Sequence, residues 1–386
     1  MPMPGAHGMM PETDHDEASR MNFVYAFKEH VTRNVTPGAK AVYQARIEPA
    51  FQREAARPPR DRHEVHRAMR KDGTWQMFGS LSRLYQELKQ EVGEAVAHRQ
   101  AEDLRDRAQT YRATARHTTL RLDPNLAIPR YQTAVDIHLM PGGYHTERMT
   151  DDVTAGAIYD PGVYLFAMGA LGPYNEDMGL GILRWLKANR PDFKPRRILD
   201  MGCAVGHCTT PYADAFPEAE IHAIDVAAPV LRYAQARAES MGYAVHFSQQ
   251  NAERTDFPAG HFDLIVSHIL LHETSRKAIY AIMKECHRLL KPGGMVIHLE
   301  AALRYAEMDP YDAFIRDWST HNNAEPVWGA VKEMDLVDPA LKAGFKPQNV
   351  IQSYTPLVTG TDYLLDTGRG NKAAGPKQFI YGGIKA

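Results

Sequence analysis

Apolar residues change their spacing along the chain, and the change divides it into two structural regions. Over residues 22–116 they recur at three- and four-residue steps, which is the period of an amphipathic helix. Proline and glycine at residues 36–38, 57–59 and 72–73 are expected to interrupt this helical run. The pattern therefore predicts a separate unit of three or four helices over residues 21–117.

A different rhythm begins near residue 160, where short β-branched runs alternate with amphipathic segments. Two helices, Val163–Leu171 and Glu176–Asn189, are expected first. The strands expected after them are Arg197–Asp200, Ile221–Asp225, Ala244–Ser248, Leu264–Ser267, Met295–Glu300, Asn349–Ser353 and Phe379–Ile384. Such an alternating order predicts a parallel sheet covered by helices on both faces. The predicted fold class is α/β, a doubly wound, mostly parallel, seven-stranded Rossmann-like sheet with an additional N-terminal helical domain.

The remaining segments complete a division of the 386 residues into four parts. Residues 1–20 mix proline, glycine, methionine and charge without apolar periodicity, so we expect a mobile tail. Residues 118–159 mix short β-like runs with proline and Gly-Gly, which favours a connector or a small β element. The ligand-binding α/β domain is expected over residues 160–386, with the helical domain of residues 21–117 serving as a lid or a dimerisation surface.

Composition and charge exclude several classes of protein. A hydrophobic fraction of 44% and a charged fraction of 24% are ordinary for a globular protein. The net charge of −2 and the interleaved acidic residues of the arginine-rich helical unit argue against a nucleic-acid partner. No apolar run approaches the ~20 residues that span a bilayer. Three cysteines and no recognisable export signal favour a reducing compartment. We expect a cytoplasmic protein with a small-molecule ligand, no membrane partner and possible homodimerisation.

A glycine-rich turn follows the first predicted strand, at residues 198–206. The strand ends in Asp200, and Gly202 and Gly206 follow it. Ligands of such sheets bind at the carboxyl ends of the strands, and glycine lets the backbone approach them closely. Dinucleotide folds use the spacing G-x-G-x-x-G for a pyrophosphate. Here the spacing is Asp-x-Gly-x-x-x-Gly, and its leading carboxylate suits a cationic ligand better.

Four further elements follow this turn in order. The second strand ends in Asp225, at an offset suited to accepting hydrogen bonds from ribose hydroxyls. The third runs into Asn251-Ala252-Glu253, and the fourth ends in Ser267-His268. A Lys-Pro-Gly-Gly turn at residues 291–294 introduces the fifth strand. A chance glycine loop would not be followed by this series.

Over about residues 195–305 the series resembles class I S-adenosylmethionine-dependent methyltransferases, and most closely the ubiquinone/menaquinone-biosynthesis-like group (methyltransferase type 11/12). The first motif of that family is an acid followed by Gly-Cys-Gly-x-Gly. The chain matches it at Asp200, Gly202, Cys203 and Gly206 and departs from it at Ala204. The resemblance implies S-adenosylmethionine as the cofactor. The cofactor-binding residues it implies are Asp200, Gly202, Cys203, Ala204, Gly206, Asp225, Val226, Asn251, Ala252, Glu253, Ser267 and His268.

Methyl transfer is an in-line displacement at an activated carbon, so alignment and exclusion of water are the enzyme's main tasks. A hydroxyl acceptor also needs a group that takes its proton. The catalytic candidates lie after the fourth strand and in the aromatic segment after the fifth: His268, His272, Glu273 and His321. No metal site is predicted, because His272 and Glu273 are more simply explained as a helix cap or pocket wall.

The expected activity is transfer of a methyl group to a small-molecule metabolite (EC 2.1.1.-), with O-methylation of a ring-bearing natural product in biosynthesis preferred. Acceptor carbon, nitrogen and sulfur stay open as alternatives. A nucleic-acid methyltransferase is disfavoured, because the Asn/Asp-Pro-Pro-aromatic run of base-amino methyltransferases is missing after the fourth strand. A protein that binds the cofactor without transferring its methyl group is a third alternative.

Overall fold

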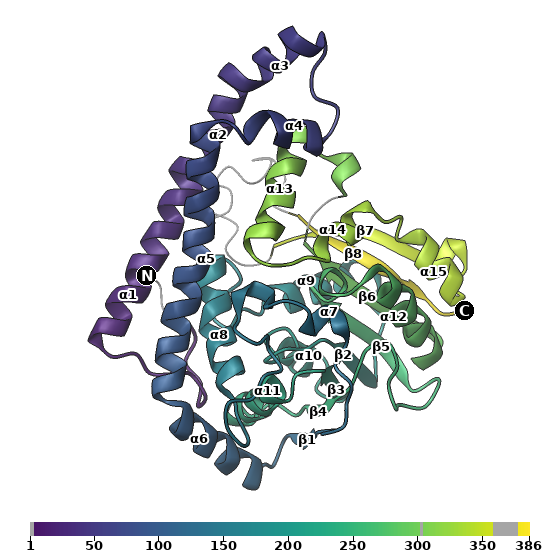
Figure 1. The fold of residues 1–386 in the computed structure, drawn as a ribbon. Helices are drawn as coiled ribbons and strands as arrows, with labels where there is room; N and C mark the ends of the chain where they lie inside the picture. Colours follow the sequence, from purple (N-terminus) through teal and green to yellow (C-terminus); the bar gives the residue numbers. More distant parts are fainter. Residues whose placement is uncertain (1–3, 302–303, 358–376) are drawn as a thin grey trace.

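An eight-stranded, mostly parallel sheet forms the centre of the molecule (Figure 1). A computed structural model describes residues 4–301, 304–357 and 377–386. The spatial order of the strands is β1-β4-β3-β2-β5-β6-β8-β7. The strands are β1 Thr119–Arg121, β2 Arg197–Met201, β3 Glu220–Asp225, β4 His246–Gln249, β5 Phe262–His268, β6 Leu290–Glu300, β7 Val350–Pro356 and β8 Lys377–Ile384.

The first six strands in this spatial order run parallel, whereas β8 pairs antiparallel with β6 and with β7. All seven predicted strands are present, and the Rossmann-like class is confirmed. The sheet has one strand more than predicted, because β1 of the expected connector pairs with β4. The order reverses at β2, whose neighbours are β3 and β5, so a ligand is expected beside the carboxyl end of β2.

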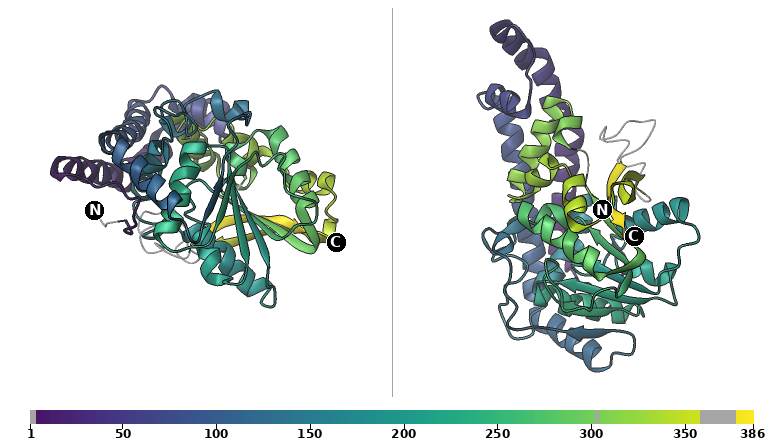
Figure 2. Two further views of the ribbon diagram at one scale, coloured as in Figure 1. Left: turned by 90° about the horizontal axis from the view of Figure 1, so that it is seen from below. Right: turned by 90° about the vertical axis from the view of Figure 1, so that its right-hand side faces the viewer.

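Helices cover both faces of the sheet (Figure 2). Buried side chains of the strands pack against α9, α10 and α11 in one hydrophobic core and against α12 and α15 in a second core. The bounds in this region are α8 Thr154–Ala167, α9 Asp177–Asn189, α10 Thr210–Ala215, α11 Ala228–Ser240, α12 Arg276–Leu289, α13 Pro310–Asn322, α14 Trp328–Glu333 and α15 Val337–Ala343. Helix α8 begins nine residues before the predicted Val163, since the helix continues through Pro161.

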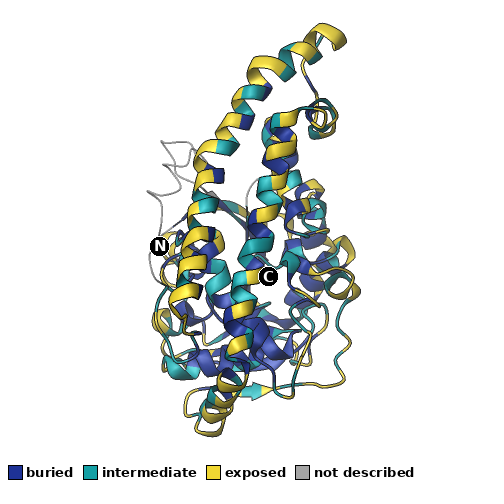
Figure 3. Cartoon of the chain, turned by 60° about the vertical axis from the view of Figure 1, so that its left-hand side comes forward, coloured by how far each residue is buried: buried dark blue, intermediate teal, exposed yellow. Residues whose placement is uncertain are grey.

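The N-terminal helices form a long arm beside the sheet domain (Figures 1 and 3). They are α1 His15–His30, α2 Thr36–Val42, α3 Glu48–Ala55, α4 Arg62–Met69, α5 Gly73–Arg99 and α6 Ala101–Ala113. Exposed residues predominate where the arm projects, and buried residues gather in the sheet domain (Figure 3). None of the helices in the described ranges has the length and apolar character that crossing a membrane requires.

The predicted helix break at residues 36–38 is wrong. Two π-helical turns, Val31–Val35 and Tyr43–Ile47, join α1, α2 and α3 into one helical column. Pro37 and Pro49 each follow one of these turns. A wider π turn shifts the hydrogen-bond ladder by one residue, which explains how the column accommodates two residues without an N–H. The column ends at Ala56, whose φ of 54° is left-handed.

Residues 4–20, expected to be a mobile tail, contact the sheet domain instead. Helix α1 already begins at His15, where Asp14 caps it in a capping box with Glu17. Met9 is fully buried in a core with α6, α8 and α11. Nε2 of His7 lies 2.9 Å from Oδ2 of the buried Asp160 on α8. The start of the chain therefore belongs to the core of the sheet domain.

The helix after β6 packs on the N-terminal arm. Phe314 of α13 is buried against Trp75 of α5, with ring centroids 4.5 Å apart. Trp318 lies 5.2 Å from the same indole. These aromatics thus pack in a core that joins α13 to the N-terminal arm.

Candidate active site

The turn after β2 is held close to the neighbouring strand. The backbone N–H groups of Gly202 and Cys203 donate to the carbonyl of Ile224 on β3, over 2.8 and 3.0 Å. Gly202 has a φ of 73°, and a Cβ there would lie 2.7 Å from Cδ1 of Leu270. Ala204, which replaces the family's usual glycine, also adopts a left-handed φ of 44°. The sequence departure at Ala204 therefore leaves the turn in its glycine-like shape.

Two aspartates lie at the ends of the central strands. Asp200 is 1% exposed, and its Oδ2 accepts from Thr209 Oγ1 over 2.6 Å. Asp225 accepts from the N–H of Ala204 over 3.1 Å and from the N–H of Ala227 over 3.0 Å. Burial raises the pKa of Asp225, although these two backbone donors oppose the shift. Asp225 thereby connects the glycine turn to the end of β3.

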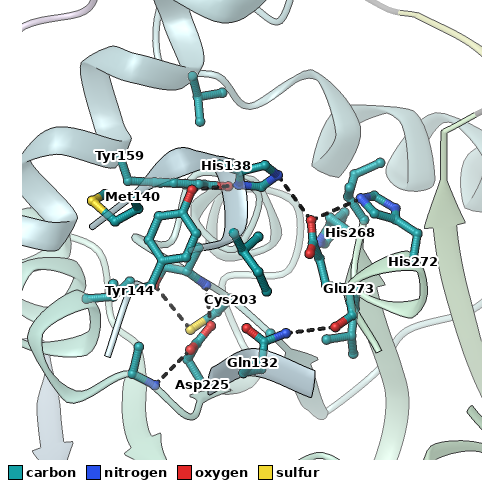
Figure 4. A pocket seen from close by; sticks show the side chains of 18 of the residues that line it. Gln132, His138, Met140, Tyr144, Tyr159, Cys203, Asp225, His268, His272 and Glu273 are labelled. Atoms are coloured by element: carbon teal, nitrogen blue, oxygen red, sulfur yellow. Dashed lines mark hydrogen bonds and ion pairs between the residues drawn. The ribbon is translucent and has the colours of Figure 1, made fainter. Parts of the chain in front are cut away.

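A cavity of about 350 Å³ opens above these strand ends (Figure 4). Gly202, Cys203, Ala204 and Asp225 line one part of it, and Gln250, Asn251 and Ala252 continue this wall. The opposite wall comes from the connector and from helices α5 and α8. Its main apolar residues are Ile137, Met140, Tyr144, Ile158, Tyr159 and Phe166. One continuous space therefore joins the glycine turn to an aromatic chamber.

Sequence comparison identifies the family to which the central part of the chain is similar. Residues 198–294 match the methyltransferase domain family. The demethylmenaquinone methyltransferase of Thermus thermophilus is 32% identical over 106 residues, which are 28% of this chain and 47% of that protein. The ubiquinone/menaquinone biosynthesis C-methyltransferase of Coxiella burnetii is 31% identical over 137 residues, 33% of this chain and 52% of that protein. The chain carries a class I S-adenosylmethionine-dependent methyltransferase domain.

The chain spans about half the length of these curated relatives. A structure of Haemonchus contortus phosphoethanolamine N-methyltransferase 2 with S-adenosylhomocysteine aligns with a TM-score of 0.43 and 16% identity. It covers 59% of this chain and 58% of that one.

The methyltransferase domain places most of the predicted residues on the cavity. The predicted residues that line it are Gly202, Cys203, Ala204, Asp225, Val226, Asn251, Ala252, His268, His272 and Glu273. The others lie outside the lining: Asp200, Gly206, Glu253, Ser267 and His321.

The residues outside the lining have identifiable positions. Ser267 is fully buried and bonds to Nδ1 of His298 over 2.6 Å. Glu253 accepts from the hydroxyl of Tyr131, which lines the cavity. His321 is exposed, and its ring lies 5.2 Å from that of Trp318. The structure thus places His321 apart from the other three catalytic candidates.

The polar end of the cavity is built around Glu273 (Figure 4). Its Oε1 lies 3.2 Å from Nε2 of His138 and 3.3 Å from Nε2 of His272. His138 also lies 2.6 Å from Oε1 of Glu325. His272 lies 2.8 Å from Oε2 of the buried Glu300, and the indole of Trp328 stacks on its ring.

Charge governs the protonation of this cluster. Burial disfavours the charged form of His138, but Glu273 and Glu325 outweigh it and raise the pKa of His138 to about 9. Burial likewise opposes protonation of His272, yet Glu300 and Glu273 raise its pKa to about 10. Burial favours the neutral form of Glu273, but the charge of His138 lowers the pKa of its carboxyl well below the usual range. At the polar end, the Glu273 carboxylate therefore lies between two imidazoles, His138 and His272, that favour the protonated form.

Sequence reasoning missed the residues that come from outside the motifs. His138, Tyr144 and Tyr159 lie in the expected connector of residues 118–159, and Glu325 follows α13. The one signal for them was Gly142-Gly143-Tyr144-His145, of which Tyr144 and His145 line the cavity. Tyr164 and Met168, at the end of α8, are buried outside the lining, whereas Phe166 of α8 lines it. Periodicity alone does not show which face of α8 borders a cavity.

Proposed function

We propose that this chain transfers a methyl group from S-adenosylmethionine to a small, largely apolar acceptor bound in the aromatic chamber. The observation that carries the proposal is the shared cavity: the glycine turn and Asp225 border the same space as the tyrosines of the chamber. A volume of about 350 Å³ falls in the range of small-ligand sites.

The residues present fit the methyl donor. Among the described residues, Oδ1 of the buried Asp200 accepts no hydrogen bond, and Nδ1 of His268 lies 3.4 Å from it. This negative charge under the turn suits a donor that brings a sulfonium and an ammonium group. Asp225 would hold the ribose hydroxyls, Asn251 the adenine edge, and the turn from Gly202 the methionine portion. Bound there, the donor supplies a methyl carbon already activated for displacement.

The chain's own contribution is then alignment and exclusion of water. Tyr144 and Tyr159 pack edge to face, with centroids 5.4 Å apart, and form a rigid wall suited to a planar ring. Glu273 lies at the polar end, where its carboxylate would accept a hydrogen bond from an acceptor hydroxyl. An oxygen nucleophile on a ring-bearing metabolite satisfies both features, and O-methylation is therefore the preferred reaction.

A ring carbon is the second candidate nucleophile. The curated relatives include C-methyltransferases of ubiquinone and menaquinone biosynthesis. An activated aromatic ring with a hydroxyl group would occupy the same chamber and turn a carbon toward the donor. O-methylation forms a carbon–oxygen bond, whereas C-methylation forms a carbon–carbon bond.

We expect the full chain to transfer label from [methyl-¹³C]S-adenosylmethionine to at least one member of a panel of phenols, catechols and hydroquinones. The ¹³C shift of the product separates an O-methyl from a C-methyl group. The same panel includes amines and thiols. If the chain binds the donor but methylates no small molecule while it methylates protein or RNA in a lysate, the proposed acceptor class is wrong.

Gly162 offers a way to close the chamber without disturbing its packing. It lines the cavity from α8, and a Cβ built on it meets no atom within 4 Å. We expect Gly162→Leu to raise the KM for the acceptor about 10-fold or more, because its side chain would fill acceptor space. Affinity for S-adenosylhomocysteine, measured by calorimetry, should stay within about 2-fold.

Gly38→Leu is the matched control. Gly38 is an exposed helical glycine, also with nothing within 4 Å of a built Cβ, and it lies outside the cavity lining. This variant should leave both constants unchanged. An unchanged acceptor KM in Gly162→Leu would show that the acceptor binds elsewhere.

A further inference from the structure

Three side chains in the cavity wall direct metal-ligand atoms at one point. They are His138, Glu273 and Glu325, and one ligand atom from each lies within 4.8 Å of the others. Nε2 of His138 is 2.6 Å from Oε1 of Glu325 and 3.2 Å from Oε1 of Glu273. Neighbouring ligands of one ion lie about 3 Å apart when each bond is about 2.1 Å long. The observed separations bracket this value.

Carboxylate oxygens at this point lack hydrogen-bond donors. Glu325 has a side chain only 4% exposed, yet no donor among the described residues bonds its Oε2. The same holds for both side-chain oxygens of Glu273, although two imidazoles lie within ion-pair distance of one of them. Buried carboxylates without donors are costly unless a cation compensates them. Positive charge between the two glutamates, supplied either by a protonated His138 or by a bound cation, would compensate them.

The three residues also have the supporting contacts that metal ligands usually have. The second ring nitrogen of His138 bonds to the hydroxyl of Tyr144 over 2.6 Å, which fixes the direction of the imidazole. Asn323 donates to Oε1 of Glu325 over 2.5 Å. His272, itself anchored on Glu300, stands behind Glu273. A hydrogen bond from outside the three thus holds the His138 ring and the Glu325 carboxylate, and His272 lies beside Glu273.

We propose that His138, Glu273 and Glu325 bind one divalent transition-metal ion in the wall of the cavity. One imidazole and two carboxylates form a mixed set that suits ions such as Mn²⁺. In the ion's absence a proton on Nε2 of His138 occupies the same position between the carboxylates. The two occupants are alternatives, and metal binding displaces that proton.

The test titrates Mn²⁺ into the full chain, previously dialysed against a chelator, while electron paramagnetic resonance reports the free ion. We expect one ion per chain, with saturation below about 1 mM free Mn²⁺. Mn²⁺ is the chosen probe because it binds protein ligands more weakly than the other divalent first-row transition metals do, so isolated surface histidines hold it only weakly.

Two variants assign the site. Glu325→Gln keeps the size of the side chain and removes its charge, and His138→Asn keeps a residue type that tolerates the left-handed φ of 56° found there. Each should weaken Mn²⁺ binding at least about 10-fold. Glu307→Gln, at an exposed glutamate paired with Arg304, is the matched control and should bind as the parent does. Circular dichroism verifies that each variant folds.

No bound Mn²⁺ at 1 mM, or equal binding by the parent and Glu325→Gln, would overturn the proposed metal site and leave an ion-pair network in its place. The measurement needs neither methyl donor nor acceptor. Its failure is therefore distinct from a failure of the proposed methyl transfer.

Discussion

Asp225→Ala is expected to weaken the binding of S-adenosylhomocysteine by roughly 100-fold or more. The reason is the loss of hydrogen bonds from the ribose hydroxyls to a charged acceptor, each contributing about 1.5–3 kcal/mol. The substitution also frees the N–H groups of Ala204 and Ala227, which now bond to this carboxylate. Isothermal titration calorimetry on the full chain measures the change.

Two further variants separate binding from folding. Asp225→Asn keeps an oxygen acceptor of the same size, so it should lose less affinity than the alanine variant. Asp256→Ala is the control, since Asp256 is exposed and pairs with the exposed Arg121. It should bind like the parent. If Asp225→Ala binds within about 3-fold of the parent, the assignment of Asp225 to the ribose is wrong.

The strand ends were predictable because their chemistry is local. Asp200, Gly202 and Asp225 belong to turns in which a few consecutive residues determine both backbone shape and direction. Once the alternating β-α pattern was read, these turns had to meet at one edge of the sheet. Gly202 and Asp225 do line one cavity, and Asp200 lies buried directly beneath the turn.

The acceptor wall was not predictable in the same way, because it is assembled from distant segments. His138 and Glu325 are 187 residues apart in the chain, yet their side chains lie 2.6 Å from each other. No periodic pattern marks His138, which follows a short helix in irregular backbone and has a left-handed φ. Lys89 and Gln90 reach the cavity from α5, so the N-terminal helical region forms part of the wall. A helix pattern shows that α5 has an apolar face without showing what that face encloses.

The same limit applies to the start of the chain. Residues 4–20 have no apolar period, so sequence reasoning predicted a mobile tail. Their contacts depend on single side chains instead: His7 reaches Asp160, and Met9 fills a gap between helices. Isolated anchors of this kind leave no repeating signal.

Asp160→Asn should destabilise the fold by about 3–5 kcal/mol, because it removes the carboxylate that pairs with the buried side chains of His7, His207 and Arg237. Nε2 of His207 lies 2.6 Å from Oδ1 of Asp160, and Nε of the fully buried Arg237 lies 3.2 Å from Oδ2. Burial favours the neutral acid, but His207 and the guanidinium of Arg237 lower the pKa of Asp160 well below its ordinary value. Burial lowers the pKa of His207 itself, so Arg237 is the partner that carries the charge at neutral pH. The stabilisation is therefore present above the usual aspartate pKa of about 4 and is lost as the pH falls below it.

Urea unfolding at pH 7, followed by far-UV circular dichroism, measures the effect. Asp256→Asn is the matched control, because its partner Arg121 is exposed and such surface pairs contribute about 0–1 kcal/mol. The Asp160 variant leaves the buried guanidinium of Arg237 without its carboxylate partner. The shift of the urea midpoint reports the free-energy cost of that unpaired charge. His7→Ala removes one ring of the same cluster and leaves the carboxylate paired with Arg237, so its loss should be smaller. If Asp160→Asn and Asp256→Asn unfold at the same urea concentration, the cluster does not hold the start of the chain and α8 against the sheet domain as its geometry indicates.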